Sequence, residues 1–96
     1  MATVEFKNNQ LYLNGQVDFD NAQQIYQQGL VQLKQQQSWP IQVDLSNLQH
    51  GNTLVLAIFI QWLRACPSMQ SLKLTAVPEK MRGIIRASNL MQLLEK

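Results

Sequence analysis

The chain has 96 residues, of which 46% are hydrophobic and 15% charged, so it can form one folded domain and differs from disordered segments. Its net charge of +2 is small, and its basic residues are scattered except for Lys80, Arg82 and Arg86. We interpret these three as solvated side chains. The lack of a continuous basic stripe argues against a nucleic-acid partner. The single cysteine, Cys66, and single histidine, His50, exclude an intramolecular disulfide and a Cys/His zinc site. We expect no metal and no cofactor.

Alternating apolar residues near the N-terminus predict two short antiparallel strands joined by a tight turn at Asn8-Asn9. The apolar positions of these strands are Val4, Phe6, Leu11 and Leu13. A glutamine-rich segment follows, in which apolar residues recur at helical spacing. It predicts an amphipathic helix that is capped by Asp18 or Asp20 and ends near Gln37.

The middle of the chain combines a strand with an apolar helix. Apolar residues alternate over residues 41–45, which predicts a third strand. After a polar loop, helical spacing begins at Asn52 or Thr53 and continues to Cys66, where Pro67 stops it.

The remaining residues complete an alternating pattern of strands and helices. A fourth strand is expected around residues 72–74, a third helix after Pro78, and a short final helix at residues 90–94. The order β-β-α-β-α-β-α predicts an α/β fold over residues 1–96, with a mixed sheet of about four strands covered by three to four helices.

No segment resembles a signal peptide or a membrane-spanning helix. The N-terminal residues alternate polar and apolar side chains and lack the long apolar run of a signal peptide. The longest apolar stretch, Leu54 to Ile60, has seven residues, whereas a spanning helix needs ~20. We therefore expect a cytoplasmic protein that does not insert into the membrane itself, although a membrane complex could recruit it.

The sequence offers no recognisable catalytic constellation. Neither of the glycine-rich phosphate-binding patterns is present, and the four glycines are spread across the chain. Cys66 and His50 fall at opposite ends of the apolar helix, about 20 Å apart, too far for a nucleophile and its base. The carboxylate of Asp44 has no second carboxylate beside it in sequence. We expect a protein that binds rather than catalyses.

The apolar helix has two apolar stripes. One stripe fits packing against the sheet and contains Leu56, Phe59, Ile60 and Leu63. The opposite stripe contains Leu54, Ile58 and Trp62, flanked by Ala57 and Ala65. Because surface helices normally keep that side polar, it must pack against either a neighbouring helix or another protein. On the second interpretation, Trp62 is the expected hot spot.

The first residues of the apolar helix, Asn52 and Thr53, allow a functional and a structural interpretation. The N–H groups at a helix N-terminus and the helix dipole favour negative charge, so a phosphate on Thr53 is locally tolerated. The same residues fit a purely structural cap, with Asn52 or Thr53 contributing ~1 kcal/mol. The predicted partner-binding residues are Asn52, Thr53, Leu54, Ala57, Ile58, Gln61 and Trp62.

Four segments carry a recognisable signature. The run IQVDLSNL at residues 41–48 is followed, after a short loop, by Asn52-Thr53 at the start of the apolar helix. The run LYLNGQVD at residues 11–18 and the closing Ser88-Asn89-Leu90 fit the same pattern. Over nearly the whole chain, this sequence resembles the STAS family, in which a strand ending V-D-L-S leads to D-[S/T] at the start of an apolar helix. The resemblance implies a STAS fold and a functional hydroxyl on Thr53.

The STAS resemblance implies two possible functions. STAS domains include anti-sigma factor antagonists, which are switched by phosphorylation at the position of Thr53. They also include the small subunit of an ABC transporter that maintains outer-membrane lipid asymmetry. This chain has Asn52 in place of the usual aspartate, and its apolar stripe favours a constitutive contact. We therefore predict a non-catalytic subunit that stabilises or regulates the transporter's cytoplasmic ATPase, in an inner-membrane complex with a permease. The alternative is an anti-sigma factor antagonist phosphorylated at Thr53.

Overall fold

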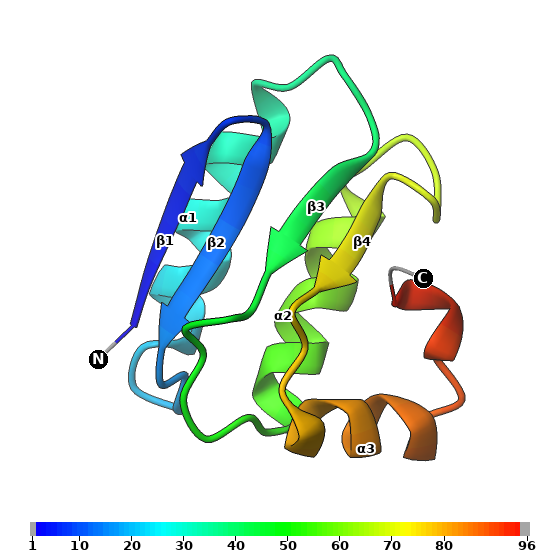
Figure 1. Cartoon of the computed structure of the whole chain (residues 1–96). Helices are drawn as coiled ribbons and strands as arrows, with labels where there is room; N and C mark the ends of the chain where they lie inside the picture. Colours follow the sequence, from blue (N-terminus) through cyan, green and yellow to red (C-terminus); the bar gives the residue numbers. More distant parts are fainter. Residues whose placement is uncertain (1, 95–96) are drawn as a thin grey trace.

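A four-stranded mixed sheet in the order β1-β2-β3-β4 organises the chain (Figure 1). The computed structural model describes residues 2–94. Its strands are β1 (Ala2–Lys7), β2 (Gln10–Gly15), β3 (Ile41–Asp44) and β4 (Leu72–Thr75). Strand β1 pairs antiparallel with β2, whereas β2, β3 and β4 are parallel because a helix crosses over between each successive pair. The predicted element order and the mixed sheet are confirmed.

The helices occupy two regions around this sheet. Helices α1 (Ala22–Lys34) and α2 (Thr53–Arg64) cover one face and lie behind the sheet in Figure 1. Helix α3 (Glu79–Ala87) lies beyond the carboxyl end of β4, and the short 3-10 turn η1 (Met91–Leu93) returns beside that strand. None of the helices within the described part of the chain has the length and hydrophobicity needed to cross a bilayer.

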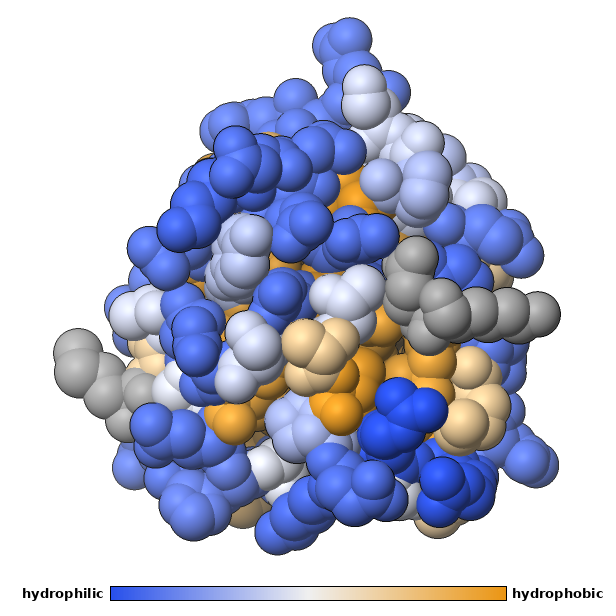
Figure 2. Space-filling model, in the orientation of Figure 1, coloured by the Kyte–Doolittle hydropathy of each residue, from blue (hydrophilic) through white to orange (hydrophobic). Residues whose placement is uncertain are grey.

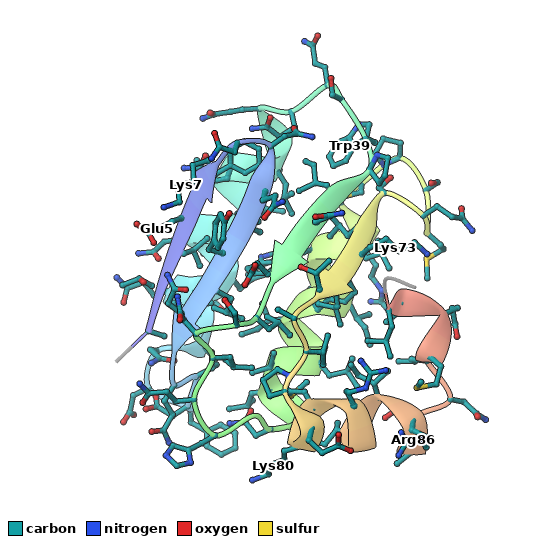
Figure 3. The ribbon with its side chains drawn as sticks, viewed as in Figure 1. Glu5, Lys7, Trp39, Lys73, Lys80 and Arg86 are labelled. Carbon is teal, nitrogen blue, oxygen red and sulfur yellow. The ribbon has the colours of Figure 1, made fainter. Side chains whose placement is uncertain are left out.

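The sheet has one apolar face and one polar face because successive side chains of a strand point in opposite directions. The face towards α1 and α2 contributes the buried side chains of Leu11, Leu13, Ile41, Val43, Leu72 and Leu74. The opposite face carries polar residues, including Glu5, Lys7 and Lys73 (Figure 3). The same view in Figure 2 is largely hydrophilic over β1 and β2. Helix α2, on which the sequence predicts the apolar contact, lies on the other side of the sheet from this polar face (Figure 1).

The loop before α1 differs from the sequence prediction. Asn21 is the N-cap residue of α1, and its side chain makes no capping hydrogen bond. Asp18, one of the two predicted caps, instead accepts hydrogen bonds at Oδ1 from the backbone N–H groups of Asp20 (2.9 Å) and Asn21 (3.0 Å). The predicted cap at Asp18 or Asp20 is wrong because these residues form a turn that ends one residue before the helix.

Helix α3 supports the loop that leads into α2. Met81 is fully buried, and a Cβ added at Gly51 would overlap its side chain. Only glycine therefore allows this loop to approach α3 so closely. At the other edge, a parallel bridge between Leu74 and Leu94 covers part of β4. The contact between Gly51 and Met81 thus places the loop before α2 against α3.

Candidate functional site: the start and outer face of the second helix

Asn52 caps α2 and also ties it to the loop before α1. Its Oδ1 accepts hydrogen bonds from the backbone N–H groups of Leu54 (2.9 Å) and Val55 (3.3 Å), which confirms the predicted cap. Its Nδ2 donates to the backbone carbonyl of Val17 at 2.9 Å. An aspartate could accept the first two bonds but could not donate the third. The structure therefore gives a physical role to asparagine at this position.

Thr53 is exposed at the first residue of α2. The sequence predicts free N–H groups next to it that would tolerate a phosphate, but the N–H groups of Leu54 and Val55 already donate to Asn52. The first turn contains no acidic residue that would oppose an anion. The corner therefore presents an accessible hydroxyl, but with fewer free donors than the sequence suggested.

Trp62 does not belong to the exposed surface, and its prediction as a partner hot spot is wrong. Its side chain is 0% exposed. The indole lies against Gly29 of α1 so closely that a Cβ added there would overlap the ring, and its Nε1 donates to the Tyr26 carbonyl at 2.9 Å. The physical reason is that a glycine on the neighbouring helix makes room for the whole indole. This part of the stripe packs against a neighbouring helix.

The groove between α1 and α2 is formed by the exposed part of the predicted stripe. Leu54, Ala57 and Gln61 line it, with Ile58 only 6% exposed. It has a volume of about 340 Å³. Its other wall is contributed by Ala22, Gln23 and Tyr26 of α1. The contribution of the α1 residues to the groove was not predicted, because the spacing of residues within one helix does not show which side chains a neighbouring helix brings next to it.

Among residues 2–94, the groove is lined by uncharged side chains alone. The acidic and basic residues closest in sequence are Asp20 before α1 and Arg64 at the end of α2. An uncharged, partly apolar groove suits a protein surface better than it suits a phosphate or a metal ion. Residues 2–94 contain no group of three His, Cys, Asp or Glu side chains arranged to hold a metal.

Cys66 and His50 are not brought together. Helix α2 ends at Arg64, so Cys66 lies beyond its C-cap rather than in its last turn, while His50 is exposed in the loop before the helix. The Cys66 Sγ donates to the Trp62 carbonyl at 3.3 Å. Burial raises the pKa of the Cys66 thiol above its ordinary value, which keeps it protonated near neutral pH. This cysteine is packed as an apolar residue.

Comparison with known proteins agrees with the fold. The family model described as "Mlab, STAS domain" matches residues 2–95. The chain belongs to the MlaB STAS-domain family. The STAS resemblance and the predicted fold class are therefore confirmed. Comparison with curated protein sequences finds no match.

Solved structures show the same relationship. The chain is similar to a chain of the Acinetobacter MlaFEDB complex in its ATP-bound Vtrans1 conformation, at 47% identity and a TM-score of 0.88, covering 97% of this chain and 98% of that one. For the Vtrans2 conformation the identity is 48% and the TM-score 0.87, over 96% and 97% of the two chains. An anti-sigma factor antagonist from Mycobacterium paratuberculosis has a TM-score of 0.77 at 16% identity, covering 98% and 81%. That last likeness shows a shared fold alone.

Proposed function

We propose that this protein is a non-catalytic accessory subunit of an MlaFEDB-type lipid transport complex and binds the complex's ATPase on the cytoplasmic side of the inner membrane. The observation that carries this proposal is the 47% identity, over nearly the full length of both chains, to a chain of the Acinetobacter MlaFEDB complex. The permease of the complex would then hold this chain at the membrane through the ATPase.

We place the contact at the Asn52-Thr53 corner and the groove between α1 and α2. The described residues that line the groove are uncharged and include the exposed Ala57 and the half-buried Leu54, a composition that fits a lasting protein contact. Because Asn52 ties the start of α2 to the loop before α1, little conformational freedom is lost at this corner on binding. The chain would stabilise or regulate the ATPase by binding to it, and nucleotide chemistry would remain with the partner.

The alternative function is an anti-sigma factor antagonist switched by phosphorylation of Thr53. The exposed hydroxyl at the start of α2 favours it. The backbone N–H groups occupied by Asn52 and the uncharged groove beside them favour a constitutive contact instead. Under that alternative, incubation with a cognate kinase would add one phosphate at Thr53, whereas the transporter proposal expects an unchanged mass.

The direct test is co-purification of the tagged chain with the ATPase and permease from detergent-solubilised inner membrane. Thr53→Arg should remove the association, because it places a long charged side chain beside the groove. It should change the free energy of unfolding by less than about 0.5 kcal/mol, since Thr53 is exposed. Thr3→Arg is the matched control: Thr3 is also an exposed threonine, but lies on β1, and its variant should co-purify as the wild type does.

Two results would contradict the proposal. One is a wild-type chain that leaves the membrane fraction without the ATPase. The other is a folded Thr53→Arg variant that still associates with it.

A further inference from the structure

Phe19 is an apolar side chain that the rest of residues 2–94 leaves uncovered. It is 89% exposed, far more than the other exposed large apolar residues, which are Val31, Met69 and Met91. A phenylalanine ring left in water gains nothing from the hydrophobic effect. In the loop between β2 and α1, the ring is therefore free to bury its surface in a partner.

The loop holds Phe19 in a fixed position. Asn21 Oδ1 accepts from the Asp18 backbone N–H at 2.9 Å, and Asp18 Oδ1 accepts from the Asn21 backbone N–H at 3.0 Å. Asn21 Nδ2 also donates to the Gln16 carbonyl at 3.0 Å. These bonds join residues that precede Phe19 in the chain to Asn21, which follows it. The ring is thus presented by an ordered turn, and binding it costs little backbone entropy.

The same loop is joined to the start of α2. Val17, two residues before Phe19, is fully buried, and its carbonyl accepts the hydrogen bond from Asn52 Nδ2. In Figure 1 the loop after β2 and the loop before α2 lie at the same end of the sheet. Phe19 is therefore held at the same end of the molecule as Thr53, and Ala22 of the groove is three residues further along the chain.

The charge around Phe19 differs from that of the groove. Asp18 and Asp20 flank the ring in sequence, two of only six acidic residues in a chain of net charge +2. Asp20 is exposed, and the groove next to the loop contains no charge. A complementary partner surface would combine an apolar pocket for the ring with a basic side chain at its rim.

We propose that Phe19 is an anchor of the ATPase interface, inserting its ring into an apolar pocket of the ATPase subunit whose rim carries a lysine or arginine facing Asp20. This inference rests on the proposed function and adds a residue that the interface predicted from α2 does not contain. Exposed aromatic rings that fill a partner's pocket are typical hot spots. The ATPase, rather than a second copy, is the occupant because the loop adjoins the groove assigned to it.

The test measures the dissociation constant of the full-length chain with the purified ATPase subunit. Phe19→Ala should weaken binding by about tenfold or more, the usual loss at a hot spot, while the urea midpoint of the free chain stays unchanged because the ring is exposed. Phe19→Leu should retain part of the affinity. Met69→Ala is the control, since Met69 is 58% exposed but lies in the loop after α2, at the helix's other end; it should bind within about twofold of wild type.

Asp20→Asn tests the basic rim separately. The wild-type dissociation constant should rise with salt concentration, and this variant should show a weaker salt dependence. Wild-type binding together with unchanged affinity of Phe19→Ala would overturn the inference and leave the proposed function standing. Absence of wild-type binding would instead overturn the proposed function on which the inference rests.

Discussion

The two ends of the outer stripe of α2 carry similar apolar side chains in different surroundings. At the carboxyl end, Trp62 fills the space above Gly29 and donates a hydrogen bond to α1. At the amino end, Leu54 and Ala57 open into a groove that α1 leaves unfilled. An apolar stripe is therefore an interface only where the neighbouring helix does not cover it.

The largest expected effect comes from closing the space at the buried end. Gly29→Ala introduces a methyl group that overlaps the Trp62 ring, so the ring or helix α1 must shift. We expect the free energy of unfolding to fall by about 1–3 kcal/mol, the usual cost of overpacking a core. Urea unfolding followed by circular dichroism measures the change.

Gly83→Ala is the matched control for this substitution. Gly83 is also helical, in α3, and an added Cβ there meets no atom within 4 Å. Alanine at that position should raise the free energy of unfolding by about 0.5–1 kcal/mol through its helix propensity. Similar changes in the free energy of unfolding for both variants would contradict this account. They would show that α1 does not pack closely on Trp62, and the two ends of the stripe would then not differ in packing.

A smaller effect is expected at the exposed end. Asn52→Asp keeps the acceptor for the N–H groups of Leu54 and Val55 but removes the donor to the Val17 carbonyl. We expect a loss of about 1 kcal/mol in the free energy of unfolding, the usual net value of one hydrogen bond. Asn47→Asp, at an exposed loop position, should change it by less than about 0.5 kcal/mol. Equal effects of the two substitutions would show that the Asn52 amide does not hold the loop.

The sequence predicted the order of strands and helices because each element is specified by its own spacing. The cap at Asn52 was also predictable, since a short polar side chain before an apolar helix is a local signal. Burial of Trp62 was not predictable in this way, because it depends on Gly29, which lies 33 positions earlier in the chain, in another helix. The exposure of Phe19 was not predictable either, because the turn around it is set by hydrogen bonds from the backbone N–H groups of Asp18 and Asn21 to each other's side chains, which no periodicity reports.

The central claim is that the amino-terminal end of the outer face of α2, and not its carboxyl end, binds the ATPase. Two exposed alanines allow a direct comparison: Ala57 in the groove and Ala65, the C-cap residue that follows α2. A photo-cross-linking amino acid placed at each position in turn, in the assembled complex, reports which end the ATPase contacts. We predict an ATPase adduct from position 57 and none from position 65. An adduct from position 65 alone, or equal adducts from both positions, would contradict the claim.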